Sequence, residues 1–156
     1  MPSILFVCTG NTCRSPMAEA LFRFKLKQRI GDISGWSIAS AGTWAHGGLP
    51  ASPEAVAVMA KRGIDLSQHR SQCVNAELIA RFDLILTMER SHQEALTAEF
   101  PHLSSRIYML SEMALLRIGV VDPMGGPISE YEHTAREIEA WLERGWVTIL
   151  SHLSIK

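Results

Sequence analysis

Residues 4–16 read Ile-Leu-Phe-Val-Cys-Thr-Gly-Asn-Thr-Cys-Arg-Ser-Pro, and this stretch decides the fold. Its beginning is continuously apolar, which is typical of a short strand buried on both faces. A small polar loop follows up to Ser15, and it contains Gly10 and Asn11, the residue types that best tolerate a positive φ. Pro16 then stands at the first position of an expected helix, with Ser15 as its cap. A strand, a polar loop and a helix N-terminus together bind phosphate, because backbone N–H groups point inward and the helix end carries a partial positive charge.

The loop lacks the Gly-Lys-Ser/Thr ending of a nucleotide-binding P-loop. Instead Cys8 opens it and Arg14 closes it, with five residues between them. N–H donors, a cation and a helix dipole stabilise a thiolate, so we expect the pKa of Cys8 to lie below its ordinary value of about 8.5. Arg14 can fork onto two phosphoryl oxygens. The pattern predicts an anionic sulfur aimed at phosphorus. The expected phosphate-binding residues are Thr9, Gly10, Asn11, Thr12, Cys13, Arg14 and Ser15.

Cys-x5-Arg-Ser at the first strand–helix junction resembles the low molecular weight protein tyrosine phosphatases. The run from Cys8 to Pro16 is most similar to the bacterial branch that includes protein-arginine phosphatases. The resemblance extends from about residue 3 to about residue 145, so it covers nearly the whole chain. It implies a phosphocysteine mechanism in which Cys8 is the nucleophile and Arg14 binds the phosphoryl group.

The chain of 156 residues is long enough for one domain, which we expect to span residues 1–156. Its content of 47% apolar and 20% charged residues is typical of a soluble globular protein. A net charge of −1 gives no basic field, so neither nucleic acid nor a membrane is expected as a partner. Without a membrane-length apolar run or a signal at the N-terminus, the sequence predicts a cytoplasmic protein, and we expect a monomer.

The apolar pattern predicts alternating strands and helices. Strands are expected at 4–7, 36–41, 82–88 and 106–110, and helices at 16–30, 53–62, 75–81, 89–99 and 128–152, with one or two helical turns at 112–117. Gly145 is the weak point of the last helix. The order β-α-β-α-α-β-α-β-α implies an α/β, three-layer fold with a four-stranded parallel sheet and helices on both faces. Ligands of such sheets bind at the carboxyl ends of the strands, which is where Cys8 stands.

Phosphoryl transfer to sulfur needs an acid that protonates the leaving group, since a departing phenolate or guanidine is a strong base. Asp122 is the candidate, because Pro123 biases it towards extended backbone and Gly125 and Gly126 leave its loop mobile. The family resemblance places the general acid at an Asp-Pro at this point of the chain. The alternative is an ordinary turn. The resemblance implies phosphorylated proteins as substrates and inorganic phosphate as a product.

Second-shell contacts around the loop are also expected. Asn11 readily adopts the left-handed conformation, and the hydroxyl of Ser15 can donate to the sulfur of Cys8. The resemblance implies that Ser40 and His69 support Asn11 through hydrogen bonds. A histidine that is merely satisfied within its own loop is the alternative for His69.

The cysteines and histidines form no metal-binding pattern. Cys8, Cys13 and Cys73 make no Cys-x2-Cys pair, and the six histidines lack ligand spacing, so neither a metal nor another cofactor is expected. Cys13 either traps an oxidised Cys8 as a reversible disulfide or is a small apolar residue behind the loop. A redox sensor and an arsenate reductase are the competing functions. The second needs two further cysteines, and only Cys73 lies outside the loop.

The resemblance also bears on the substrate. Tyrosine-specific members carry aromatic residues after Asp-Pro, whereas this chain has Met124 followed by two glycines. Arginine-specific members carry a threonine at the position of Thr12 and the same two glycines, although they usually have Phe at the position of Met124. Trp44 lies in the loop that forms one wall of the family's substrate slot, or else it packs on its own loop. These features favour phosphoarginine over phosphotyrosine, unless Thr12 is only a loop residue and specificity is set elsewhere.

Overall fold

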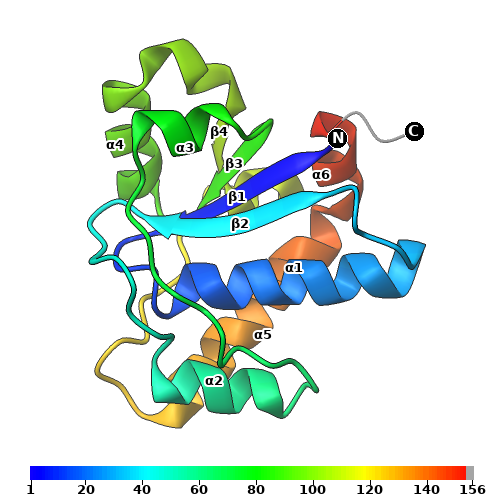
Figure 1. The fold of residues 1–156 in the computed structure, drawn as a ribbon, viewed down its shortest axis with the longest axis vertical. Coiled ribbons are helices and arrows are strands. Elements are labelled where there is room, and N and C mark those ends of the chain that lie inside the picture. The colour runs from blue at the N-terminus through cyan, green and yellow to red at the C-terminus, as the bar shows by residue number, and fades with distance from the viewer. Residues whose placement is uncertain (154–156) are drawn as a thin grey trace.

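The computed structural model describes residues 1–153, and residues 154–156 of the predicted domain lie outside the described part. Its centre is one sheet of four parallel strands in the order β2-β1-β3-β4 (Figure 1). The strands are β1 (Ser3–Cys8), β2 (Ser37–Gly42), β3 (Leu84–Thr87) and β4 (Ile107–Met109). The predicted α/β fold with a four-stranded parallel sheet is therefore confirmed.

Helices cover both faces of the sheet. They are α1 (Arg14–Ile30), α2 (Pro53–Ala60), α3 (Ala76–Ala80), α4 (Arg90–Glu99), α5 (Ile128–Arg144) and α6 (Trp146–His152), with the 3-10 helices η1 (Pro101–Arg106) and η2 (Leu110–Ala114). In Figure 1, α1, α2 and α5 lie below the sheet, and α3 and α4 lie above it. No helix within residues 1–153 is long and apolar enough to cross a membrane.

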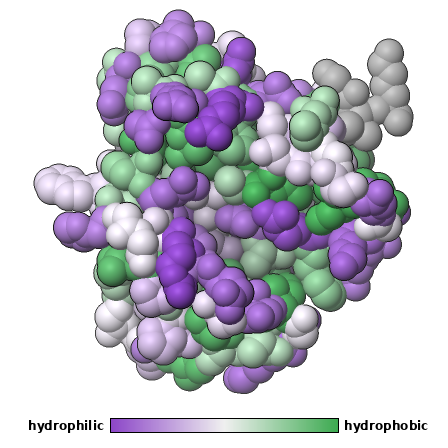
Figure 2. Space-filling view, in the orientation of Figure 1, coloured by the Kyte–Doolittle hydropathy of each residue, from purple (hydrophilic) through white to green (hydrophobic). Residues whose placement is uncertain are grey.

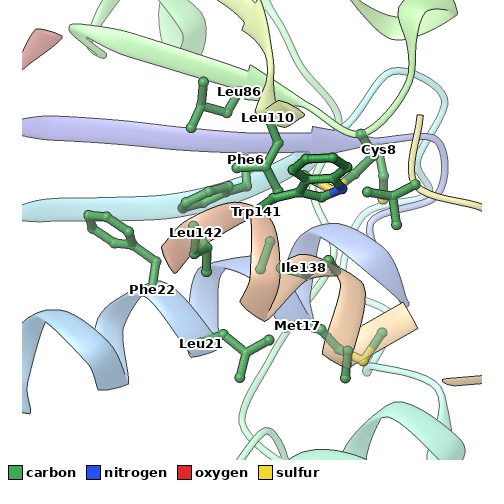
Figure 3. Packing of buried hydrophobic residues seen from close by; sticks show 14 of the residues in the cluster. Phe6, Cys8, Met17, Leu21, Phe22, Leu86, Leu110, Ile138, Trp141 and Leu142 are labelled. Atoms are coloured by element: carbon green, nitrogen blue, oxygen red, sulfur yellow. The ribbon is translucent and has the colours of Figure 1, made fainter. Parts of the chain in front are cut away.

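Alternate residues of β1 point into two different cores, which is why its apolar run is unbroken. Ile4 and Phe6 belong to a core shared with α1, α5 and α6, whereas Leu5 and Val7 belong to a core shared with α3 and α4. Figure 3 shows Phe6 facing side chains of α1 and α5 in the first core. The strand that carries Cys8 is thereby fixed from both sides.

The start of α1 differs from the position predicted from the sequence, and the predicted last helix is divided into two. The first helix begins at Arg14 with Cys13 as its N-cap, so Ser15 lies inside the helix and its prediction as the cap is wrong. The hydroxyl of Ser15 is instead engaged by the side chains of Cys8 and Asn11. The predicted weak point at Gly145 is a real break between α5 and α6. The packing there also requires a glycine, because a Cβ would lie 2.6 Å from the Cβ of Met113.

The surface drawn in Figure 2 intersperses hydrophilic and hydrophobic side chains. A groove of about 760 Å³ runs along α1, between it and the chain that follows α2. Its lining includes Phe24, Lys27, Ile64 and Leu66, but neither Cys8 nor Arg14. The chemistry predicted from the sequence thus lies elsewhere, at the carboxyl end of β1.

Candidate active site

Outward hydrogen bonds shape the loop that follows β1. Four of its carbonyls are bonded to neighbouring segments: Cys8 O accepts from Thr43 N (2.9 Å), Thr9 O from Trp44 N (3.0 Å), Asn11 O from His69 Nε2 (2.7 Å) and Thr12 O from Ser52 N (2.9 Å). In a trans peptide the N–H points opposite to the carbonyl. The N–H groups that follow these carbonyls therefore point into the loop; they belong to Thr9, Gly10, Thr12 and Cys13.

Two backbone positions make this tight loop possible. Asn11 has φ 58, in the left-handed region, as its residue type predicts. Gly42, the last residue of β2, lies so close that a Cβ would stand 2.3 Å from Thr9 O and 3.1 Å from Asn11 N. A larger residue at position 42 would displace the loop.

The side chain of Asn11 orients the hydroxyls around it. Its Oδ1 accepts from Gln72 N at 3.0 Å, which identifies Nδ2 as the donor to Ser15 Oγ at 2.8 Å and to Ser40 Oγ at 3.0 Å. Because Ser15 Oγ accepts from Asn11, its own hydrogen can be donated to Cys8 Sγ at 2.9 Å or to Ala41 O at 3.4 Å, and the sulfur is the nearer acceptor. The structure thus joins the expected residues Asn11, Ser15 and Ser40 in one hydrogen-bond network beside the sulfur, while His69 is bonded to Asn11 O.

A carboxylate closes the outer end of this network. Glu19 Oε1 accepts from Ser40 Oγ at 2.8 Å, so the hydroxyl of Ser40 donates to Glu19 and accepts from Asn11. Glu19 Oε2 is held by Arg23 at 3.1 Å. The hydrogen bonds therefore run outward from Asn11 in two branches: one passes through Ser40 to Glu19, and the other passes through Ser15 to the sulfur of Cys8.

Cys8 is 3% exposed, and this burial has a cost that the sequence does not reveal. Desolvation raises the pKa of the Cys8 thiol, and the hydrogen bonds from Ser15 and the charge of Arg14 oppose that effect only in part. The expectation of a lowered pKa for Cys8 is therefore wrong. The physical reason is that the loop excludes water from the sulfur, and this desolvation raises the pKa by more than the surrounding donors lower it.

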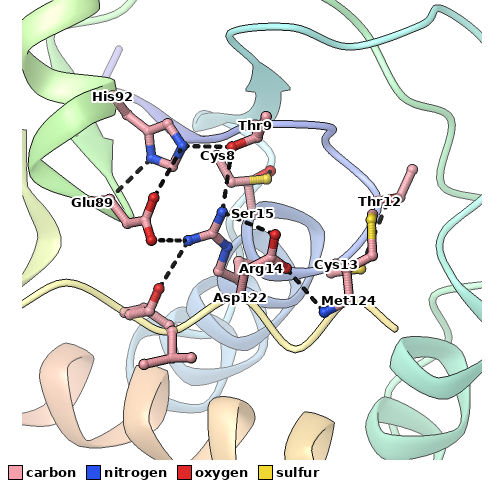
Figure 4. Close-up of polar contacts among 12 residues, drawn as sticks. Cys8, Thr9, Thr12, Cys13, Arg14, Ser15, Glu89, His92, Asp122 and Met124 are labelled. Carbon is pink, nitrogen blue, oxygen red and sulfur yellow. Dashed lines mark hydrogen bonds and ion pairs between the residues drawn. The ribbon is translucent and has the colours of Figure 1, made fainter. Parts of the chain in front are cut away.

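Arg14 is 2% exposed and is fixed through one of its two terminal nitrogens. Its Nη1 donates to Val120 O at 2.9 Å and meets Glu89 Oε1 at 3.2 Å (Figure 4). The edge formed by Nε and Nη2 is left for a ligand, and Nη2 lies 3.6 Å from Asp122 Oδ2 and 3.5 Å from Thr9 Oγ1. A guanidinium held in this way can present two parallel N–H groups to phosphoryl oxygens.

Asp122 lies at the mouth of the same cleft. Its Oδ1 accepts from Met124 N at 3.0 Å, and its Oδ2 faces Arg14. The side chain is 43% exposed, so a leaving group and water can reach it. The cleft is lined by Cys8, Gly10, Thr12, Cys13, Arg14, Asp122 and Met124. A thiol, a guanidinium and a carboxylate thus converge on one small space.

The family model for "Low molecular weight phosphotyrosine protein phosphatase" matches residues 3–152. The chain belongs to this family. Among its relatives is the probable low molecular weight protein-tyrosine-phosphatase EpsP of Ralstonia nicotianae, with 38% identity over 91% of this chain and 94% of that protein. The protein-arginine-phosphatase of Bacillus subtilis is also 38% identical, over 90% and 92%. An arsenate reductase of Bacillus cereus is 34% identical, over 91% and 92%.

A solved low molecular weight protein tyrosine phosphatase from T. tengcongensis has a TM-score of 0.86 and 40% identity, and the match covers 95% of this chain and 99% of that one. The similarity therefore extends over the whole sheet and its helices. The family includes relatives named for three different activities: tyrosine phosphatase, arginine phosphatase and arsenate reductase.

The remaining predicted residues are placed as follows in this member of the phosphatase family. Cys13 Sγ lies 3.4 Å from Ser52 Oγ and 3.6 Å from Tyr131 Oη, behind the loop, and both Cys8 and Cys13 are free thiols. Trp44 is 80% exposed and does not line the cleft, whereas Met124 lines it and is 59% exposed. The role of Trp44 in substrate binding stays a prediction.

Five residues that support this site were not predicted from the sequence: Glu19, Gln72, Glu89, His92 and Val120. Glu89 and His92 carry a readable signal, because Glu-x-x-His between a strand and a helix has the spacing of a capping box. Glu19 follows Ser15 by one helical turn, which also suggests a shared face. Gln72 and Val120 act through backbone atoms, and residue type does not reveal such contacts.

Proposed function

We propose that this chain is a protein phosphatase that removes phosphoryl groups from protein side chains through a phosphocysteine intermediate. The observation that carries the proposal is the convergence of Cys8 Sγ, Arg14 Nη2 and Asp122 Oδ2 on one cleft. The cleft holds both a nucleophile and an acid, so it is suited to turnover and not only to binding a phosphopeptide.

The reaction has two steps. The Cys8 thiolate attacks phosphorus, and the bond from phosphorus to the leaving oxygen or nitrogen breaks as Asp122 gives that atom its proton. Asp122, now a carboxylate, takes a proton from water, whose oxygen attacks the phosphocysteine and releases inorganic phosphate and the thiolate. Inward N–H groups and Arg14 hold the phosphoryl oxygens in both transition states.

We propose phosphoarginine as the preferred substrate over phosphotyrosine. Thr12 lines the cleft and narrows it with a branched side chain, and its hydroxyl is available to orient the attacking water. Met124, followed by two glycines, supplies no aromatic wall for a phenol ring. The arginine phosphatase relative supports this choice, and the equally similar EpsP supports the alternative.

Arsenate reduction is the second candidate, supported by the relative that carries this name. That chemistry needs cysteines that pass a disulfide outward. Cys73 is the one cysteine outside the loop, and its exposed Sγ lies 4.0 Å from Thr43 O. Phosphatase chemistry needs no such relay, and this difference favours it.

The test compares wild type, Cys8→Ser and Asp122→Ala on an aryl phosphate and on phosphoarginine and phosphotyrosine peptides. We expect no turnover by Cys8→Ser, and for Asp122→Ala the largest loss of rate on substrates with poor leaving groups, about 10²-fold or more. Equal rates for wild type and Cys8→Ser would end the phosphatase proposal. Thr12→Ile should lower the phosphoarginine-to-phosphotyrosine ratio, and an unchanged ratio would contradict the role of Thr12. Arsenate-dependent thiol oxidation in place of hydrolysis would favour the second candidate.

A further inference from the structure

The hydroxyl of Thr9 has two contacts that the two-step mechanism does not use. Its Oγ1 lies 2.8 Å from Nε2 of His92, which is 4% exposed at the start of α4. The same oxygen lies 3.5 Å from Nη2 of Arg14. Figure 4 shows the hydroxyl between the imidazole ring and the guanidinium.

The tautomer of His92 follows from its other nitrogen. The backbone N–H of Glu89 donates to His92 Nδ1 at 3.1 Å, so Nδ1 is an acceptor and the ring hydrogen is on Nε2. Burial and the charge of Arg14 lower the pKa of His92 to about 4, which keeps the ring neutral near pH 7. His92 therefore donates to Thr9 Oγ1.

The proton of Thr9 is then left for another acceptor. A hydroxyl oxygen has two lone pairs and one hydrogen, and in Thr9 the lone pairs face the N–H groups of His92 and Arg14. Within residues 1–153 no acceptor other than His92, whose Nε2 is itself a donor, lies at hydrogen-bonding distance from this hydroxyl. Thr9 is not among the residues that line the cleft, but its Oγ1 lies 3.5 Å from Arg14 Nη2, which belongs to the edge that is open for a phosphoryl group. The free O–H is therefore within reach of an oxygen that this nitrogen binds.

We propose that Thr9 is a further catalytic residue, whose side-chain hydroxyl donates a hydrogen bond to a phosphoryl oxygen, and that His92 is the positioning residue that turns this hydroxyl towards it. The inference rests on phosphoryl binding in the proposed function. It adds to the ring of backbone donors one side-chain donor with an enforced direction.

The decisive measurement is the affinity for inorganic phosphate, taken from the protection of Cys8 against alkylation by iodoacetamide. A Cys73→Ser background removes the one exposed thiol within residues 1–153. Thr9→Val, which has the same shape without the hydroxyl, should bind phosphate about tenfold more weakly, whereas Thr9→Ser should stay within about threefold of the parent. Equal Kd values for Thr9→Val and Thr9→Ser would overturn the proposal.

The role of His92 is tested by a double-mutant cycle. His92→Phe removes the donor, and we expect it to weaken phosphate binding about as much as Thr9→Val does, with no further loss in the double variant. His92→Gln, which can still donate, should largely restore the affinity. Additive losses in the double variant would show that His92 acts independently of Thr9, and the positioning role would be wrong.

Two measurements separate this inference from other failures. Thr97→Val and His102→Phe lie outside the site and should change neither the Kd nor the pH dependence of alkylation. If Thr9 acts on the phosphoryl group, Thr9→Val should leave the pH profile of Cys8 alkylation unchanged; a shifted profile would assign its hydroxyl to the sulfur and contradict the proposal. Phosphate protection requires no turnover, so the inference can hold even if the wild type hydrolyses none of the tested substrates.

Discussion

At the scale of single residues, the direction of each hydrogen bond near Cys8 determines whether its sulfur receives a donor. Ser15 Oγ accepts from Asn11, and therefore its hydrogen can serve the Cys8 sulfur. The backbone N–H of Gln72 donates to Oδ1 of Asn11. Without this hydrogen bond the side-chain amide of Asn11 could flip, and the direction of the hydrogen bonds would be lost. A buried sulfur is ionised only at a cost, so each aligned donor reduces that cost.

Ser15→Ala tests this alignment at one atom. Because the hydroxyl is among the factors that lower the pKa of Cys8 against its burial, we expect its removal to raise that pKa further and to move the alkylation profile to higher pH. The rate of alkylation by iodoacetamide, followed from about pH 5 to about pH 10, reports the fraction of thiolate. Ser104→Ala, at an exposed position of η1, is the control. An unshifted profile in Ser15→Ala would mean that its hydroxyl donates elsewhere.

At the scale of elements, the end of β2 packs against the loop that follows β1 and restricts its conformation. Gly42 leaves no room for a Cβ beside Thr9 O, at 2.3 Å. We expect Gly42→Ala to lower kcat/KM for an aryl phosphate at least tenfold and to destabilise the fold by about 1–3 kcal/mol through overpacking. Gly35→Ala is the matched control, because a Cβ there meets nothing within 4 Å. Wild-type kinetics in Gly42→Ala would show that the loop adapts without loss of its geometry.

The start of α4 links the capping of a helix to acid sensitivity. His92 closes a capping box with Glu89, and its pKa in the folded protein is about 4, below the ordinary value of 6.5. Between these values the unfolded chain binds a proton that the folded chain does not, so stability is full above about pH 6.5 and falls as the pH drops towards 4. The loss from this one group is at most about 3 kcal/mol.

We therefore expect His92→Gln to lose less stability than the wild type when the pH falls from 7 to 4. Urea unfolding at a series of pH values measures the difference. His102→Gln, on the exposed helix η1, should follow the wild-type curve. Parallel curves for wild type and His92→Gln would contradict a protonation of His92 coupled to unfolding.

Local patterns predicted the elements well and the long-range contacts poorly. The unbroken run of β1 and the Pro-led start of α2 are local signals, and both elements lie where their residues suggest. The prediction that Ser15 caps the first helix is wrong. A serine before a proline has the sequence pattern of a cap, but in the structure Ser15 lies inside α1. The partners of Arg14 are Glu89 and Val120, which follow it by about 75 and 106 positions in the sequence. No rule of local spacing predicts contacts at such separations. For the same reason the burial that raises the pKa of Cys8 could be known only from the packed structure.

At the scale of the whole molecule, the site is assembled where three separate segments meet beside the carboxyl ends of β1 and β3. The loop after β1 supplies the sulfur, the start of α4 supplies Glu89 and His92, and the chain after η2 supplies Val120 and Asp122. Each segment is tied to a strand or helix that packs into one of the two cores. An anion that binds at the centre should therefore stabilise the fold as a whole and not only its loop.

This coupling can be measured as a rise in stability with inorganic phosphate. A ligand that binds only the folded state adds about 2.7 kcal/mol at a concentration of 100 times its Kd. We expect that increment, in urea unfolding or as a higher Tm, for the wild type and for Cys8→Ser, which keeps the amides and the guanidinium. Arg14→Met should lose most of it, because the buried fork that holds two phosphoryl oxygens is gone. Arg81→Met, at an exposed position after α3, should keep the full increment, and chloride at equal ionic strength should give none. An equal rise in Arg14→Met and wild type would place the phosphate somewhere other than the loop after β1.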